Sequence, residues 1–402
     1  MDADAGQLVF DPLDPGFLQD PYPTYAALRE REPLLRSPAG AWVLTRYADV
    51  LAALGDTRLG NSPSRYAVLH PRNRSRHVAA DVANNIIPFL EPPQHTLPRR
   101  LISRTFHARL HASAPRLDRV ARELLELHAG AGKLELIADF GTPFAATVLC
   151  GLMGLPEDDR DRLIEWSRWF FYLFAPIPSE QILLGLDRAL AEFRDYIAGA
   201  IDERRREARD DLIGSLLAAR DGEESLGEAA LIDHCMLLFA DGIENVHAAI
   251  ANAVVALLDH PQQLCRLRED PGLALRAADE CLRFDSPAQS IARVAREDLE
   301  LFGRTIRRDE PLLLVLGSAN RDPARFRRPD ALDVGRTPNP YLSFGRGRHS
   351  CVGAMLVRQE VAAAIGALFE VMPAVARAET RLHWSPRPGH RWLESLPLTT
   401  GR

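Results

Sequence analysis

Apolar residues recur every three or four positions along most of this chain, and short polar or proline-containing breaks separate the runs. That spacing places apolar side chains on one face of a helix and predicts helices at 117–127, 189–205 and 211–219. The run from about 227 to 258 is longer, more apolar and nearly free of proline, so we expect one long helix there. Short apolar runs predict strands at 41–44, 299–301 and 311–316.

Composition narrows the class of protein. The chain has 402 residues, of which 46% are hydrophobic, and this is enough for a large core. The net charge of -6 and the lack of a Lys or Arg run argue against a nucleic-acid partner. Residues 1–6 are acidic and lack the apolar run of a signal peptide or membrane anchor. We therefore expect a soluble, cytoplasmic protein without a membrane partner.

Cysteine usage points to one segment. The five cysteines are scattered, and none forms a Cys-x-x-Cys pair, so neither a zinc site nor a disulfide framework is indicated. Cys351 lies in the segment 344–353, which reads Phe-Gly-Arg-Gly-Arg-His-Ser-Cys-Val-Gly. Glycines let a backbone approach a flat ligand closely, and amide N–H groups at a helix start stabilise a thiolate. For the cysteine alone, a buried structural role is the alternative.

The whole segment resembles the haem-binding loop of cytochromes P450, Phe-Gly-x-Gly-x-His-x-Cys-x-Gly, at every fixed position. The resemblance implies haem b as cofactor, Cys351 as the axial ligand of its iron and His349 on a haem propionate. It also implies cofactor contacts for Phe344, Gly345 and Gly353. The resemblance covers almost the whole chain, so we expect a single domain, 1–402. Its fold would be mainly α with a small β region, with the haem between a long distal helix and the proximal cysteine loop.

Two further segments match the family in the same order. His95 and Arg99 follow Glu91-Pro92-Pro93, and their i, i+4 spacing on a helix brings both side chains to one face. Pro98 departs from the usual residue but falls in a first turn, where proline costs little. The resemblance implies that His95, Arg99 and Arg293 bind the propionates. It places these residues in the substrate pocket: Ser290, Ile291, Ala292 and Leu393.

The long apolar run contains Ala240-Asp241-Gly242-Ile243-Glu244-Asn245, where the family has a small residue, Gly, any residue, an acid and Thr. Gly242 and Glu244 match the glycine that opens an oxygen groove and the acid that delivers protons. Asp241 and Asn245 depart from the pattern, and their i, i+4 spacing lets them face the same groove. The resemblance also places Ala240 against the haem, and Phe239 and Ile243 in the pocket.

The two departures leave several interpretations open. Asn245 and ordered water replace the threonine, or the substrate supplies the missing hydroxyl or N–H. In a third interpretation the substrate couples to itself without oxygen insertion. In the coupling interpretation Asp241 accepts a hydrogen bond from a substrate N–H; the alternative is that Asp241 bonds only to nearby protein groups. His247 is a second candidate for holding the substrate N–H, or else a buried histidine with satisfied hydrogen bonds.

Glu280 and Arg283 match the family's Glu-x-x-Arg, and i, i+3 spacing on a helix lets the two side chains pair. We interpret the pair as a structural brace behind the cysteine loop, built partly on Arg336 or its neighbours, with no catalytic role.

The favoured function is a soluble bacterial P450 monooxygenase that activates dioxygen and hydroxylates, or similarly oxidises, a small organic substrate in secondary metabolism. A ferredoxin and its reductase are the expected electron donors, because no flavin or iron–sulfur motif is present. We also expect a monomer. Two roles are possible for a group of four arginines, a docking patch for the electron donor or a contribution to solubility: Arg100, Arg104, Arg346 and Arg348. The alternatives are oxidative C–C or C–N coupling, a peroxide-driven enzyme, and a haem protein without oxygen chemistry.

Overall fold

The computed structural model describes residues 8–61, 69–110, 114–174 and 179–401. Its contacts group into two compact units. The first unit contains Met1–Gly60, Ala248–Cys351 and Ala374–Thr399, and the second contains Asn61–His247, Val352–Pro373 and Thr400–Arg402. The chain passes between the units several times, so they are not consecutive domains, and the single domain expected from the sequence stays a prediction.

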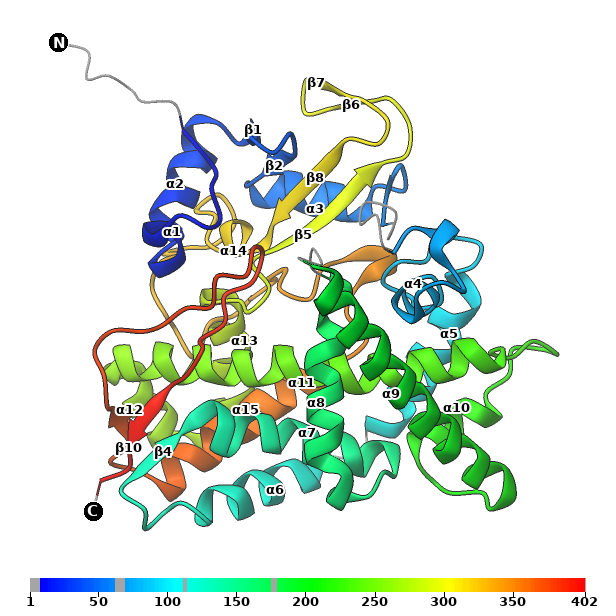
Figure 1. Cartoon of the computed structure of the whole chain (residues 1–402). Coiled ribbons are helices and arrows are strands. Elements are labelled where there is room, and N and C mark those ends of the chain that lie inside the picture. The colour runs from blue at the N-terminus through cyan, green and yellow to red at the C-terminus, as the bar shows by residue number, and fades with distance from the viewer. Residues whose placement is uncertain (1–7, 62–68, 111–113, 175–178, 402) are drawn as a thin grey trace. The chain divides into compact units, whose positions relative to one another are not determined.

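A five-stranded sheet organises the first unit (Figure 1). Its strand order is β1 (Leu34–Arg36), β2 (Trp42–Leu44), β8 (Pro311–Val315), β5 (Ser290–Ala295) and β3 (Leu59–Gly60). β2 and β8 run parallel, and the other pairs are antiparallel. Helix α3 (Tyr47–Gly55) packs against β8, and the shared core includes the fully buried Leu44, Val50, Leu312 and Leu314. These side chains fix the register of the sheet, because a slip by one residue would turn them to the other face.

The remaining helices of the first unit are α1 (Pro15–Gln19), α2 (Tyr22–Arg31), α12 (Pro261–Glu269), α13 (Ala274–Phe284) and α14 (Leu316–Ala319). Two antiparallel pairs complete its strands, β6 (Leu299–Leu301) with β7 (Arg304–Ile306) and β9 (Ala376–Arg377) with β10 (Pro397–Thr399). The strands predicted at 41–44, 299–301 and 311–316 are confirmed to within one residue.

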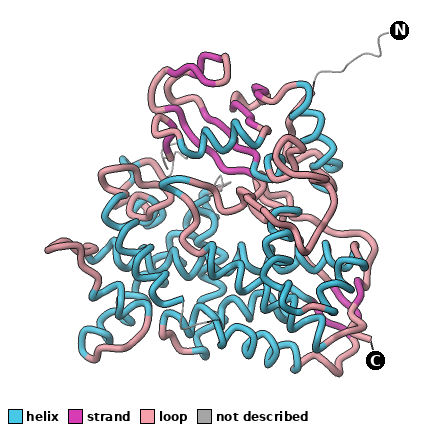
Figure 2. Tube along the Cα trace, turned by 180° about the vertical axis from the view of Figure 1, so that it is seen from behind, coloured by secondary structure: helices cyan, strands magenta, loops and turns pink. Residues whose placement is uncertain are grey.

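Helices form almost all of the second unit, while the larger sheet belongs to the first (Figure 2). The helices are α4 (Val78–Ala83), α5 (Thr96–Leu110), α6 (Ala114–Glu126), α7 (Thr142–Met153), α8 (Arg160–Phe170), α9 (Glu180–Arg206), α10 (Leu212–Ala218) and α15 (Ala354–Val371). The unit also has the short strand β4 (Lys133–Glu135).

Helix α9 is the main difference from the sequence prediction in this unit. It begins at Glu180, nine residues before the predicted start at 189. The Ser179 side chain caps it by accepting a hydrogen bond from the Ile182 N–H, and Leu183 and Leu186 are buried. Serine before an apolar run is an N-cap pattern, so the sequence contained the information for the earlier start.

Helix α11 (Glu228–Asp259) confirms the long helix predicted at about 227–258. It begins in the second unit, and its last turns belong to the first. The fold is therefore mainly α with a small β region, as the sequence predicted. Among the described residues, one stretch, Leu136–Met153, is long and apolar enough to cross a membrane, but 72% of it is buried inside the protein, as in a core helix.

Candidate active site

Helix α11 is buried on all sides except along one stripe. Between Asp233 and Leu257 only Leu238, Asp241, Gly242 and Asn245 are partly exposed, and every other residue is buried. Spacings of three and four residues place these positions on one face of the helix. These four residues are the partly exposed positions of the helix between Asp233 and Leu257, and we call Leu238, Asp241, Gly242 and Asn245 the open stripe.

Asp241 and Asn245 pair within the open stripe, as their spacing predicted. The Asn245 Nδ2 donates a hydrogen bond to Asp241 Oδ1 over 3.0 Å. Burial raises the pKa of the Asp241 carboxyl to about 6, although the hydrogen bond from Asn245 opposes that shift. Asp241 as a whole residue is nevertheless partly exposed.

Gly242 has a packing reason as well as the oxygen-groove role expected from the resemblance. A Cβ at this position would lie 2.9 Å from Leu149 Cδ1 on α7, closer than van der Waals contact allows. The helix therefore approaches α7 closely only because residue 242 is glycine.

Three predicted ligand contacts lie on other faces of α11. Phe239, Ala240 and Ile243 are 0% exposed, and the Phe239 ring meets Phe193 of α9 edge to face. All three pack in the protein core of this structure, and the pocket contacts predicted for Phe239 and Ile243 stay predictions. The periodicity of a helix that is apolar all round does not show which stripe faces a cavity, and for this reason Leu238 was missed.

Glu244 and His247 are both buried. The His247 Nδ1 lies 3.2 Å from Thr142 Oγ1, and its side chain packs over Gly141. These contacts favour the interpretation of His247 as a buried histidine with a hydrogen-bond partner.

His95 and Arg99 lie at the start of α5. His95 directly precedes the helix and is 3% exposed, and Arg99 is partly exposed one turn later. The Arg99 N–H donates to the His95 carbonyl over 3.0 Å, so the two residues share the first helical turn. Pro98 lies within that turn, as predicted.

The cysteine loop of the first unit, 344–351, is held by its own backbone. The Cys351 N–H donates to the Phe344 carbonyl over 2.9 Å, and the Gly345 N–H donates to the Leu342 carbonyl over 2.8 Å. Gly347 has φ 79°, and a Cβ there would lie 2.8 Å from the Leu54 carbonyl of α3, so only glycine fits. Phe344, Gly345, His349 and Cys351 remain partly exposed, and Gly353 takes the N-cap position of α15.

Strand β5 runs beside the cysteine loop. The Ile291 Cδ1 lies 3.9 Å from the position of a Cβ on Gly345, which itself has φ 64°. Ser290, Ile291 and Ala292 are partly exposed, as pocket residues should be. Arg293 is buried and donates to the Ala292 carbonyl over 2.9 Å. Leu393 is 4% exposed and forms an isolated antiparallel β-bridge with Trp384.

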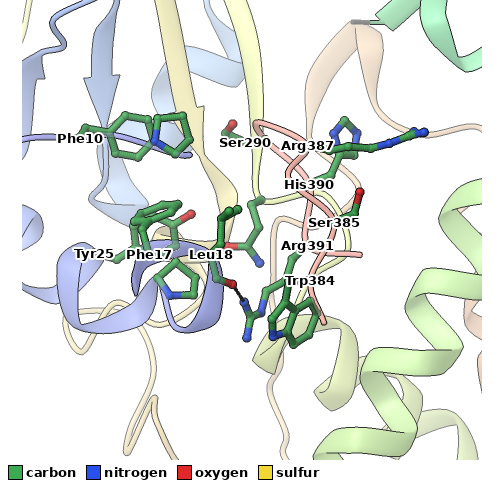
Figure 3. A pocket seen from close by; sticks show the side chains of 14 residues that line it. Phe10, Phe17, Leu18, Tyr25, Ser290, Trp384, Ser385, Arg387, His390 and Arg391 are labelled. Atoms are coloured by element: carbon green, nitrogen blue, oxygen red, sulfur yellow. Dashed lines mark hydrogen bonds between the residues drawn. The ribbon is translucent and has the colours of Figure 1, made fainter. Parts of the chain in front are cut away.

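Ser290 also lines a pocket that the sequence did not indicate (Figure 3). Phe10, Phe17 and Tyr25 from the N-terminal segment form one wall, and Trp384 and Arg391 lie opposite. Arg391 donates to the Leu18 carbonyl over 3.1 Å and stacks 3.6 Å from the centre of the Trp384 ring. These contacts join the two ends of the chain within the first unit.

The predicted brace on α13 is confirmed. Both carboxylate oxygens of Glu280 accept hydrogen bonds from Arg283 over 2.8 Å, and both residues are 0% exposed. Arg336 Nε donates to the same carboxylate over 2.9 and 3.0 Å. The Asp333 N–H and the Asn339 amide, which the sequence did not single out, complete the set of donors.

The four arginines of the proposed docking patch fall in both units. Arg100 pairs with Asp221, and Arg104 donates to the Arg220 carbonyl, both within the second unit. Arg346 is exposed and Arg348 partly exposed in the cysteine loop of the first unit.

The fold is helix-rich, the first unit contains a glycine-shaped loop with Cys351, and the longest helix has the open stripe. Comparison with known proteins identifies the family. The family model for cytochrome P450 matches residues 162–371. The biotin biosynthesis cytochrome P450 of Bacillus subtilis is 36% identical, over 95% of this chain and 97% of that protein. The mycinamicin IV hydroxylase/epoxidase of Micromonospora griseorubida is 38% identical, over 90% of this chain and 91% of that protein.

Among solved structures, P450BioI in complex with hexadec-9Z-enoic acid ligated acyl carrier protein superposes with a TM-score of 0.87 at 35% identity. The match covers 96% of this chain and 99% of that one. The chain therefore belongs to the cytochrome P450 family. It is a P450 monooxygenase, and its cofactor is haem b.

The residues present fit that cofactor. The cysteine loop contains a partly exposed cysteine and two glycines in left-handed conformations, which let the backbone approach a flat ring closely. No group of three or more His, Cys, Asp or Glu side chains within the described ranges is arranged to hold a metal ion by itself. A single thiolate ligand and a porphyrin agree with both observations.

Proposed function

We propose that this P450 inserts oxygen into a small organic substrate in bacterial secondary metabolism, with Cys351 as the iron ligand. The partly exposed Cys351 carries the proposal, because hydrogen bonds within the loop hold the backbone on which it lies. A thiolate axial ligand makes the bound haem able to activate dioxygen. The protein's own task is to hold the cofactor, place the substrate and control protons.

The propionates need cations in a buried setting. Arg99 and His95 on the first turn of α5, Arg293 on β5 and His349 in the cysteine loop would bind them. Arg293 is only 6% exposed, and a buried guanidinium is stabilised by a buried anion beside it.

Proton control would involve Glu244 and Asn245. Glu244 is buried on α11, directly before Asn245, and would deliver protons toward the groove. Asn245 cannot relay a proton as a hydroxyl does, but its amide donates and accepts hydrogen bonds. The substrate would therefore contribute a hydroxyl or N–H to the relay.

Oxidative coupling is the second candidate, and the Asp241–Asn245 pair in place of a small residue and threonine favours it. Labelled dioxygen separates the two. Label in the product indicates oxygen insertion, whereas an unlabelled product that has lost two hydrogens indicates coupling.

Electrons would come from a ferredoxin and its reductase in the cytoplasm. Arg346 and Arg348 of the cysteine loop, and Arg100 and Arg104 of α5, are candidate docking residues. A lower rate of reduction by ferredoxin after Arg346→Glu, with unchanged reduction by dithionite, would support the first pair.

The decisive experiment replaces the ligand. Cys351→Ala should lose the Soret band at about 450 nm that a thiolate-ligated, reduced, carbon-monoxide-bound haem gives. Cys265→Ala is the matched control, because Cys265 is an exposed free cysteine on α12. A Cys351→Ala protein with the wild-type spectrum and activity would overturn the assignment.

A double substitution tests the propionate contacts. Arg99→Leu with Arg293→Leu should weaken haem retention by ~2–5 kcal/mol, the cost of leaving a buried charge without its partner. Transfer of haem to apomyoglobin measures the retention. Arg307→Leu removes an exposed guanidinium paired with Asp298 and serves as control. Wild-type retention in the double variant would reject these contacts.

A further inference from the structure

The strongest departure of this chain from its family lies at Asp241 and Asn245. Both belong to the open stripe, and no other residue between Asp233 and Leu257 that carries a polar side chain is accessible there. The other two accessible positions, Leu238 and Gly242, carry no polar side chain, so Asp241 and Asn245 are the polar side chains of the open stripe.

The pair has a defined polarity. The Asn245 Nδ2 donates to Asp241 Oδ1, which orients the amide and leaves Asp241 Oδ2 and Asn245 Oδ1 as acceptors. Among the residues that the structure describes, Asp241 has no other hydrogen-bond or ion-pair partner. A carboxylate in that position lacks the compensation that buried charges require.

Asp241 forms no ion pair among the described residues, and its side-chain partner is the neutral Asn245 amide. Burial raises the pKa of its carboxyl. The nearest titratable groups along α11, Glu244 and His247, are buried on other faces, and α7 meets this level of α11 with Leu149. A ligand bound at the open stripe could therefore supply a further donor to Asp241.

We propose that Asp241, oriented by Asn245, is a substrate-recognition group that selects molecules carrying a cationic or strongly donating nitrogen. The proposal rests on the function proposed above, since it places the recognition group in the substrate space of the P450. It assigns a substrate class, an apolar body with an amine, guanidine or N–H group, and it makes Asp241 a specificity residue.

The test uses two probes with the same alkyl chain, dodecylguanidinium and dodecanoate. The guanidinium stays protonated over the accessible pH range and so does not ligate iron through nitrogen. Binding to the holoenzyme is measured by calorimetry and by the Soret shift. Asp241→Asn should weaken dodecylguanidinium binding about tenfold to a hundredfold, as expected for the loss of a charge-assisted hydrogen bond, and should not weaken dodecanoate binding.

The pH profile gives a readout that a merely structural role would not change. Since the carboxyl ionises as pH rises through about 6, dodecylguanidinium should bind wild-type protein more tightly above that pH than below it. The Asp241→Asn protein should show a flat profile. Asp195→Asn, an equal charge change on the exposed face of α9, should behave like wild type.

Asp241→Glu keeps the charge and should retain part of the preference for the cation. Equal cation affinity in wild type and Asp241→Asn, with full haem content in both, would overturn the proposal. The carbon-monoxide spectrum separates the two claims. A wild-type protein without the thiolate band that still prefers the cation would refute the proposed iron ligand and leave the recognition group standing.

Discussion

Glu280 and Asp241 are carboxylates deep within helices, but their surroundings are opposite. Glu280 on α13 accepts hydrogen bonds from two arginines, one backbone N–H and one amide. Asp241 on α11 accepts one, from the neutral Asn245 amide. A third carboxylate, Glu360 on α15, is 1% exposed, and neither of its oxygens has a hydrogen-bond partner among the described residues.

The comparison distinguishes carboxylates that stabilise the folded protein from carboxylates whose burial destabilises it. Burying a charge is unfavourable unless donors replace the lost water. Glu280 has a full set of donors, so its removal would leave two arginines uncompensated. Asp241 and Glu360 lack such a set, so their removal should relieve the folded protein. Asp241 is partly exposed, so a ligand can supply the donor, whereas Glu360 is 1% exposed, and we assign Glu360 no role.

The largest effect is expected at the brace. Glu280→Ala should lower the free energy of unfolding by roughly 3–5 kcal/mol, because Arg283 would be left buried and unpaired. Denaturant unfolding measures the change. Glu370→Ala breaks an exposed bidentate pair with Arg122 of similar geometry and should cost at most about 1 kcal/mol. Similar losses in the two variants would contradict the distinction.

Glu360→Gln should stabilise the protein at high pH. Burial raises the pKa of Glu360 from 4.5 to about 8, so the folded state holds a proton that the unfolded state releases above about 4.5. Stability is therefore lost as pH rises from 4.5 to 8, and the variant should exceed wild type by roughly 4 kcal/mol at pH 8 and not at all below pH 4. Glu223→Gln, at an exposed position, should show no such difference. A pH-independent gain would contradict the argument.

Asp241→Asn should combine a smaller gain in stability with a loss of ligand preference. The same sign applies, since burial raises the pKa of Asp241 from 3.8 to about 6. Partial exposure limits the gain to on the order of 1–2 kcal/mol above pH 6, with none below about 3.8. Thermal unfolding at two pH values measures it. A destabilised variant would mean that Asp241 supports the fold, as Glu280 does.

The smallest effect is expected at Asn245. Asn245→Ala removes the hydrogen bond to the Asp241 carboxylate but no proton carrier, so product formation should fall by about fivefold at most if the substrate carries the relay. Asn245→Thr should change the ratio of product to electrons consumed by a similar factor. Product and electron consumption measured together provide the readout. Complete loss in Asn245→Ala, with haem and substrate bound, would show that the amide itself is essential.

Local spacing predicted the pairs and missed their surroundings. The i, i+3 and i, i+4 rules found Glu280–Arg283 and Asp241–Asn245, because both pairs lie within one helix. They could not find Asn339 at Glu280 or the isolation of Glu360, since these depend on residues far away in the sequence. The sequence also did not show which face of α11 is accessible. Its apolar residues surround the helix, so the pattern alone did not show that Leu238 is partly exposed while Phe239 and Ile243 are buried.

The interleaving of the two units has a consequence for biosynthesis. Chains emerge from the ribosome with the N-terminus first, and local contacts form sooner than distant ones. Strand β2 pairs Trp42 with Leu312, and α6 packs against α15, which begins only at Ala354. The core of each unit can therefore be completed only after residues late in the chain have been synthesised. Cys351 is synthesised just before α15. The iron ligand therefore becomes available only when the core of the second unit can be completed. A chain that ends before α15 would leave the apolar face of α6 uncovered.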